Sequence, residues 1–302
     1  MGKTVQVIPH ITDEIQDWIE RVSTISTDGE DEAPDACVIE LGGTVGDIES
    51  SPFIEALRQF QFRVGRQNVC FVHVSLVPVM GPVGEQKTKP TQHTVKELRG
   101  LGITPDLIVC RSKEPLQQEI KQKLAAFCHV EPKAVISAHD VSNLYQIPIS
   151  FEKQGVRAMI ADCIGVSVSE DDEYLEDWRK MADRVDEFQE EVRIAMVGKY
   201  TGLSDSYLSV IKALQHSSIA VNRRLVIDWI ESTDLDSSIT GTDRDAHREA
   251  WETLKLADGI LVPGGFGNRG VEGKIEAARY ARESRVPYLG ICLGLQIATI
   301  CL

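Results

Sequence analysis

A single cysteine stands between two glycines near the end of the sequence, in the run Gly290-Ile291-Cys292-Leu293-Gly294. The apolar run before this cysteine predicts a strand, and the apolar residues after it are typical of a helix. Paired glycines let the backbone turn sharply, as they do in the G-x-S-x-G nucleophile elbow. At a helix N-terminus the dipole favours a thiolate, and a backbone N–H can face an oxyanion. The spacing therefore predicts that Cys292 is a catalytic thiol.

The chain contains seven cysteines, an odd number, and none of them forms a Cys-x-x-Cys pair. This spacing predicts neither a disulfide framework nor a zinc site. Most of the other cysteines, such as Cys70 and Cys110, lie in or beside apolar runs. We expect those thiols to be buried and inert.

A second glycine-rich run, Gly265-Phe266-Gly267-Asn268-Arg269-Gly270, follows the predicted strand Gly259–Val262 and matches G-x-G-x-x-G. A nicotinamide or flavin oxidoreductase would use such a run to bind a dinucleotide. It would also need an acidic residue about 20 residues further on, at the end of the next strand, to hold the ribose. That strand ends instead at Cys292, so the glycines favour exposed backbone amides over a redox cofactor site.

Two polar loops in the first half of the chain could bind phosphates. Residues 40–50 contain Glu40, Asp47 and Glu49 among four glycine and serine positions, after a predicted strand. Carboxylates in such a place suit magnesium held together with phosphate oxygens, although a solvated turn would have the same composition. Residues 84–93 place Lys87 and Lys89 among hydroxyl and amide groups, which could bind a triphosphate and a base or could be a plain surface loop.

The elements that must position these residues alternate between short apolar runs and amphipathic stretches, which predicts an α/β fold with largely parallel sheets. The predicted strands are Val5–Ile8, Ala36–Leu41, Val69–Leu76, Leu107–Cys110, Ala134–Ser137, Arg193–Val197, Leu225–Ile230, Gly259–Val262 and Pro287–Ile291. Residues 169–191 are strongly acidic, with apolar residues at helical spacing, and predict a surface helix that links two domains. We therefore expect domains at 1–168 and 192–302.

Composition limits the possible partners. The 302 residues include 46 acidic and 32 basic side chains, for a net charge of −14, which opposes nonspecific binding to nucleic acid or to an anionic membrane. No apolar run approaches the roughly 20 residues of a membrane span, and the first residues lack the apolar core of a signal peptide. A cytoplasmic location is the expectation that follows.

Together with Pro263-Gly264-Gly265-Phe266-Gly267, the run around Cys292 resembles class I glutamine amidotransferases. The order of four motifs, Glu40 to Ser50, Gly84 to His93, Leu261 to Gly267 and Leu289 to Gly294, resembles CTP synthase over essentially the whole chain. The resemblance implies two doubly wound domains, each present in part. One is a P-loop-like synthetase domain, and the other is a class I glutamine amidotransferase domain.

The activity implied by the resemblance is the ATP-dependent amination of UTP to CTP, with ammonia from glutamine hydrolysis. Cys292 would be the nucleophile, and Gly265 and Leu293 would contact glutamine and supply oxyanion amides. Glu40 would bind Mg²⁺. The implied UTP- and CTP-binding residues are Asp47, Ile48, Glu49, Lys87, Thr88, Lys89, Pro90, Thr91, Gln92 and Lys123. The implied ATP-binding residues are Arg111, Asp140 and Val141.

The same resemblance implies inhibition by CTP, activation by GTP, and assembly into homotetramers and filaments. Family members also carry an N-terminal glycine-rich phosphate loop and a C-terminal histidine and glutamate, which this sequence lacks. On that basis we expect the chain alone to be an inactive fragment. Two alternatives stay open: a non-catalytic subunit that regulates filament assembly, and another class I amidotransferase with a different acceptor.

Overall fold

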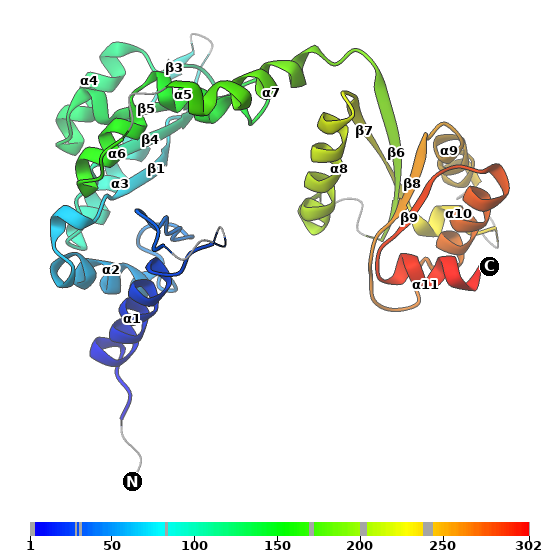
Figure 1. Cartoon of the computed structure of the whole chain (residues 1–302), viewed down its shortest axis with the longest axis horizontal. Coiled ribbons are helices and arrows are strands. Elements are labelled where there is room, and N and C mark those ends of the chain that lie inside the picture. Colours follow the sequence, from blue (N-terminus) through cyan, green and yellow to red (C-terminus); the bar gives the residue numbers. More distant parts are fainter. Residues whose placement is uncertain are drawn as a thin grey trace. The chain divides into compact units, whose positions relative to one another are not determined.

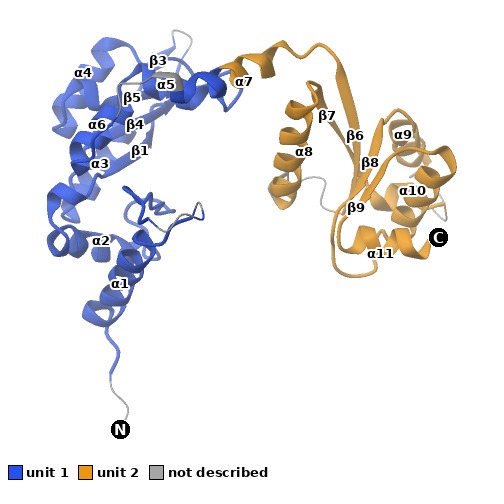
Figure 2. Cartoon of the chain, viewed as in Figure 1, with its two compact units in different colours: residues 1–179 blue, residues 180–302 orange. Residues whose placement is uncertain are grey.

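The computed structural model describes residues 4–27, 29, 32–81, 84–168, 172–199, 204–237 and 244–301. These residues form two compact units, unit 1 at 1–179 and unit 2 at 180–302 (Figure 2). The division falls inside helix α7 (Glu176–Glu187), within the stretch that was expected to link two domains. Residues 169–171 of that stretch lie outside the described residues.

Unit 1 is built on a parallel sheet with the strand order β1-β4-β5. Its strands are β1 (Val72–Leu76), β4 (Leu107–Ser112) and β5 (Val135–His139). The central strand is buried on both faces: Ile108 and Cys110 pack into one apolar cluster, and Leu107 and Val109 into another. A central parallel strand needs such a continuous apolar run, which explains why this segment was predicted correctly.

Short helices and a small hairpin complete unit 1 (Figure 1). The helices are η1 (Val7–Ile11), α1 (Thr12–Ser23), α2 (Ser51–Arg63), η2 (Arg66–Asn68), α3 (Lys89–Gly100), α4 (Gln118–Cys128), η3 (Pro132–Ala134), α5 (Gln146–Lys153), α6 (Val156–Ile164) and η4 (Asp172–Leu175). The hairpin pairs β2 (Val79–Met80) with β3 (Glu85–Gln86). Helices α1 and α2 pack together, and Arg63 of α2 forms ion pairs of 2.6 Å with Asp17 and Glu20 of α1.

Two predicted strands are wrong. Residues Val7–Ile11 form the short helix η1 where the strand Val5–Ile8 was expected, and Ala36–Leu41 is irregular. The apolar side chains in these segments are largely exposed, with Val5 at 70% and Val38 at 96%. A strand is stable only when a neighbouring strand satisfies its backbone, and neither segment pairs with one among the described residues.

Unit 2 has a four-stranded parallel sheet with the order β7-β6-β8-β9. Its strands are β6 (Glu191–Gly198), β7 (Arg224–Glu231), β8 (Gly259–Val262) and β9 (Tyr288–Gly290). Its helices, besides α7, are η5 (Ser204–Tyr207), α8 (Leu208–Ala220), η6 (Ser232–Leu235), α9 (Arg244–Lys255), α10 (Val271–Ser284) and α11 (Leu293–Ile300). Figure 1 shows α8 on the opposite side of the sheet from α9 and α10. The α/β class with parallel sheets is therefore confirmed.

The strand order of unit 2 reverses between β6 and β8, because the chain first moves outward to β7 and then returns to the other side of β6. Open parallel sheets bind ligands at such a switch point, outside the carboxyl ends of the strands. Among the described helices of both units, none is long and apolar enough to cross a membrane.

Candidate active site

The carboxyl ends of three neighbouring strands in unit 2 carry the residues that could perform chemistry. Strand β6 leads to Lys199, β8 leads to residues 263–267, here called the glycine loop, and β9 leads to Cys292. Because β6, β8 and β9 are adjacent and parallel, these three segments meet at one edge of the sheet. This edge includes the switch point.

Cys292 has a strained backbone, with φ 53° and ψ −105°, and it caps the N-terminus of α11. A positive φ is uncommon for a residue with a side chain, and such strain is often found at functional sites. The predicted strand, turn and helix are thus confirmed for residues 290–294, here called the elbow. The catalytic role of Cys292 stays a prediction.

Both glycines of the elbow are required by packing. A Cβ atom on Gly290 would lie 2.4 Å from the backbone carbon and oxygen of Gly294. One on Gly294 would lie 2.0 Å from the carbonyl oxygen of Val262, at the end of β8. The helix that starts at Cys292 therefore rests directly on the neighbouring strand, and any side chain at these positions would push it away.

The thiol of Cys292 lies beside the glycine loop. A Cβ atom on Gly264 would be 3.4 Å from Cβ of Cys292 and 3.9 Å from its Sγ, so the absence of a side chain there leaves room at the sulfur. Cys292 is exposed. The N–H of Leu293 belongs to the first turn of α11, where an α-helix offers no backbone acceptor. The predicted nucleophile therefore lies next to a candidate oxyanion donor, and Gly265 follows Gly264 in the glycine loop.

Lys199 ties the glycine loop to strand β6. Its buried side chain donates from Nζ to the carbonyl oxygens of Phe266 at 2.9 Å and Gly267 at 2.6 Å. In return, the guanidinium of Arg269 donates to the backbone oxygen of Lys199. Hydrogen bonds from a buried ammonium are strong, so this lysine holds the carbonyls of the loop in one direction. Both carbonyls lie within two residues of Gly265, so Lys199 fixes the part of the loop that follows this glycine.

A second buried lysine, Lys274 of α10, lies behind Gly265. A Cβ atom on Gly265 would be 3.7 Å from both Nζ of Lys274 and Cδ of Lys199. Within the part of the chain that the structure describes, Nζ of Lys274 has no hydrogen-bond partner. Burial, followed by repulsion from Lys199, lowers the pKa of Lys274 to about 8, and Glu231 partly opposes this shift. Neither lysine was predicted to belong to the site; the position of Lys199 directly after a strand at a switch point was the available signal.

In unit 1, residues 40–50, here called the acidic loop, border a cavity of about 730 Å³. Glu40, Asp47 and Glu49 line it together with apolar side chains of α1 and α2, including Trp18 and Phe53. All three acidic residues are exposed, as is Ile48 at 89%. The cavity thus offers carboxylates on one wall and an apolar surface on another.

The acidic loop suits magnesium only when substrate phosphates and water supply the other ligands. Its three carboxylates do not form a convergent cluster, since the one described group of three acidic or sulfur-containing residues with ligand atoms within 4.8 Å lies elsewhere. Magnesium is commonly held by one or two carboxylates together with substrate phosphates and water. Glu40 beside Gly42 and Gly43 suits that arrangement, because a phosphate can approach the bare backbone closely.

Residues 87–92, here called the lysine loop, were expected to form a loop, but they comprise a two-residue connection after β3 and the first turn of α3, at the carboxyl end of β1. Nζ of Lys87 pairs with Glu85 at 2.6 Å, and the charge of Lys123 also lowers the pKa of Glu85 after the larger effect of Lys87. Lys87 and Lys123 therefore lie near the same carboxylate, as expected for residues of one site. Lys89 and Pro90 are exposed at the start of α3.

Two threonines of the lysine loop are buried and serve the fold. The hydroxyl of Thr91 donates to the carbonyl oxygen of Leu76 at 3.2 Å and accepts from Ser75 at 2.9 Å. Thr88 accepts a 3.0 Å hydrogen bond from the side-chain amide of Gln92. These contacts leave the two lysines and Gln92 as the more accessible groups for a ligand.

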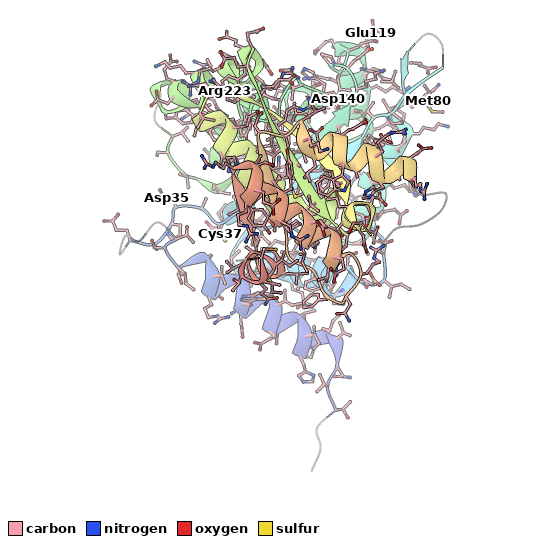
Figure 3. The ribbon with its side chains drawn as sticks, turned by 90° about the vertical axis from the view of Figure 1, so that its right-hand side faces the viewer. Asp35, Cys37, Met80, Glu119, Asp140 and Arg223 are labelled. Carbon is pink, nitrogen blue, oxygen red and sulfur yellow. The ribbon has the colours of Figure 1, made fainter. Side chains whose placement is uncertain are left out.

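The expected ATP-binding residues lie at the carboxyl edge of the same sheet. Arg111 is exposed near the end of β4, and Asp140 and Val141 follow the end of β5, where the N–H of Asp140 donates to Ser112 at 3.0 Å. Figure 3 labels Asp140, which follows β5, and Met80, which belongs to β2 of the hairpin that precedes the lysine loop. The structure therefore brings the ATP residues and the lysine loop to one edge of the sheet.

The cysteines differ in their burial, and burial changes the pKa of the thiol. Burial raises the pKa of Cys110 to about 12 and that of Cys128 to about 11, so these thiols stay protonated near neutral pH. Cys292 and Cys37 are exposed instead. The expected burial is thus confirmed for Cys110 and Cys128, whereas Cys70, which was also expected to be buried, is only half-buried.

Two protein families match the chain. The family described as CTP synthase N-terminus matches residues 1–166, and the family described as glutamine amidotransferase class-I matches residues 203–302. The first match covers unit 1 apart from its last residues. The second covers the part of unit 2 that contains the glycine loop and the elbow.

Curated relatives and a solved structure are also similar to this chain. A CTP synthase of Dictyostelium discoideum is 56% identical over 99% of this chain and 55% of its own length, and CTP synthase 1 of Homo sapiens is 54% identical over 99% and 51%. The chain spans about half the length of the curated relatives it matches. The glutaminase domain of the Trypanosoma brucei enzyme with bound acivicin is 47% identical over 36% of this chain and 39% of its own, with a TM-score of 0.31.

Proposed function

The chain belongs to the CTP synthase family, and we propose that the protein makes CTP from UTP, ATP and glutamine. Unit 2 supplies ammonia by hydrolysing glutamine, and unit 1 belongs to the domain that activates UTP and transfers the ammonia to it. The observation that carries this proposal is the placement of Cys292, at a strained helix N-terminus beside the glycine loop that Lys199 holds.

The glutaminase step follows from that geometry. The sulfur of Cys292 attacks the side-chain carbonyl carbon of glutamine, and the developing oxyanion accepts hydrogen bonds from the amides of Gly265 and Leu293. The proton of the thiol passes to the amide nitrogen, the C–N bond breaks, ammonia leaves, and a glutamyl thioester remains on Cys292. Water hydrolyses this thioester to glutamate and frees the thiol.

The synthetase step uses the ligand groups of unit 1. Lys87, Lys89, Gln92 and Lys123 bind the uridine nucleotide, with Asp47, Ile48 and Glu49 contacting bound CTP. Arg111, Asp140 and Val141 contact ATP at the sheet edge. Glu40 holds Mg²⁺, which when bound neutralises phosphate charge. ATP phosphorylates O4 of the uracil ring, and ammonia displaces that phosphate at C4 to give CTP.

Regulation and assembly are part of the same proposal. CTP inhibits by occupying part of the UTP site, GTP activates glutamine hydrolysis, and the protein assembles as homotetramers that can form filaments. Motif order over the whole chain supports this reading, because the acidic loop, the lysine loop, the glycine loop and the elbow occur together. An amidotransferase with another acceptor would not account for the first two.

The test measures CTP formation by the full-length gene product with either glutamine or ammonium as nitrogen donor. We expect Cys292→Ala to abolish the glutamine-driven reaction and to preserve the ammonium-driven one. Glu40→Gln should impair both, because it acts on the UTP-activating step. Glutamine-driven CTP formation by the Cys292→Ala protein would contradict the proposal, as would CTP formation by neither route in the unaltered protein.

A further inference from the structure

Cys70 and Cys163 of unit 1 lie beside the carboxylate of Asp106. One sulfur from each cysteine and one oxygen of the aspartate all lie within 4.8 Å of one another, and all three residues are half-buried. Cys70 precedes β1, Asp106 precedes β4, and Cys163 lies in the last turn of α6. Because the three come from distant segments, their spacing in the sequence gives no sign of the cluster.

Hydrogen bonds join Asp106 to Phe71, the residue that follows Cys70. The N–H of Asp106 donates to the carbonyl oxygen of Phe71 at 2.8 Å, and the N–H of Phe71 donates to Oδ2 of Asp106 at 2.7 Å. These bonds continue the parallel pairing of β1 with β4, which begins at Val72 and Leu107. Cys70 and Asp106 therefore sit at the amino ends of adjacent strands, at the edge opposite the lysine loop.

The packing of α6 places Cys163. Val156, Met159, Ile160 and Cys163 recur at helical spacing and contact the same apolar cluster beneath the sheet, which Cys70 also borders. Residues three and four apart share one face of a helix. Cys163 is consequently turned toward the sheet and toward Cys70.

A neighbouring arginine orients the carboxylate. Nη2 of Arg66 donates to both oxygens of Asp106, at 2.6 and 2.7 Å, and Nη1 donates to the carbonyl oxygen of Val69. Metal-binding carboxylates are usually held in this way by an outer hydrogen-bond partner. The guanidinium also places a positive charge next to the cluster.

We propose that Cys70, Asp106 and Cys163 bind a thiophilic divalent cation, with zinc as the best fit. Tetrahedral zinc, with bonds of about 2.3 Å to sulfur and about 2.0 Å to oxygen, needs ligand atoms roughly 3.5–3.8 Å apart. The observed spread of up to 4.8 Å is within about 1 Å of that requirement. Water completes the fourth position, and Arg66 balances the net negative charge that two thiolates and a carboxylate leave around a dication.

The chemistry of the thiols excludes hard cations. Two of the three donor atoms are sulfur, which binds thiophilic metals such as zinc, whereas magnesium prefers oxygen ligands. This site is thus separate in kind from the magnesium expected at Glu40.

The experiment titrates the metal-free chain with Co²⁺, reads the absorption of thiolate-bound cobalt, and then displaces it with Zn²⁺. One equivalent should bind, and Cys163→Ala should abolish the signal. Asp106→Asn should weaken binding at least tenfold. The matched control is Cys128→Ala, which removes a buried thiol that neighbours Cys110 in the same unit and should leave the titration unchanged.

Three results would overturn the proposal. They are a titration without thiolate-to-cobalt absorption, a signal that survives Cys163→Ala, and equal loss in Cys128→Ala. Mass spectrometry without reductant provides the remaining check. A Cys70–Cys163 disulfide in protein prepared under reducing conditions would show that the pair is a redox site rather than a metal site.

Discussion

The elbow of unit 2 and the acidic loop of unit 1 are both rich in glycine, but glycine serves a different purpose in each. At the elbow, a Cβ atom on Gly294 would meet the backbone of β8 at 2.0 Å. In the acidic loop, a Cβ atom on Gly42 or Gly46 would meet nothing within 4 Å. The elbow is therefore shaped by contact with a buried strand, whereas the acidic loop is shaped by its own backbone angles, such as φ 100° at Gly46.

This difference predicts which site is already formed and which one takes its final shape with a ligand. The elbow rests on the sheet through Gly294 and through the hydrogen bond from Ile291 to Val262 at 3.0 Å. The acidic loop lies against a cavity, and its carboxylates do not converge. We infer that the nucleophile is preorganised and that the carboxylates gather only around bound magnesium and phosphate.

The largest expected effect is a loss of stability when a methyl group is added to a glycine of the elbow, compared with the same change in the acidic loop. Gly294→Ala should destabilise unit 2 by about 2–4 kcal/mol, because its methyl group cannot fit against Val262. Gly42→Ala, the matched control in the acidic loop, should change stability by less than about 0.5 kcal/mol. Hydrogen exchange read by mass spectrometry reports the two units separately, and equal effects of the two substitutions would erase the contrast between the sites.

A smaller effect is expected when the glycine loop loses its hydrogen bonds to Lys199. Lys199→Met removes both hydrogen bonds to the loop carbonyls, so the glycine loop that carries Gly265 is held less firmly. We expect glutamine hydrolysis by the full-length gene product to fall about 10–100-fold, somewhat less than for direct loss of an oxyanion donor. Ammonium-driven CTP formation should not change.

The control for that experiment is Lys255→Met, which removes an exposed lysine from α9 of the same unit. It should leave both reactions at their normal rates. If Lys199→Met lowered the two reactions equally, the lysine would support the fold in general rather than the loop in particular.

The smallest effect concerns the pH dependence of stability. The pKa of Lys274 falls from 10.5 to about 8 on folding, so between these pH values the unfolded chain binds the proton and the folded chain does not. The contribution of Lys274 to stability is therefore unfavourable below pH 8 and improves as pH rises toward 10.5. Lys274→Met should flatten this part of the stability curve, and parallel curves for the two proteins would show that the lysine is not desolvated.

Sequence patterns predict the elements of this fold best where burial is complete. Strand β8 was predicted with its observed bounds because all four of its residues are buried, and the elbow was predicted because two glycines flank the cysteine. Ala36–Leu41 has a similar apolar composition but is exposed and irregular, with Val38 at 96%. Composition reports how apolar a segment is, and only the fold determines whether a neighbouring strand is present.

Sites that depend on contacts between distant segments were harder to predict. Lys199 and Phe266 are brought together by the pairing of β6 with β8, and no local pattern encodes that contact. The cluster of Cys70, Asp106 and Cys163 has the same origin. Thr91 is the opposite case. The motif predicts that it binds nucleotide, but its hydroxyl forms hydrogen bonds with residues of β1.

The most direct measurement of the central claim treats the full-length gene product with a chloroketone analogue of glutamine and maps the modified residue by mass spectrometry. A preorganised elbow predicts one adduct, on Cys292, that forms more slowly when glutamine is present and at the same rate when asparagine replaces it. Modification of the exposed Cys37 at an equal rate, or labelling of Cys292 that glutamine does not slow, would contradict the assignment of this thiol as the glutamine-directed nucleophile.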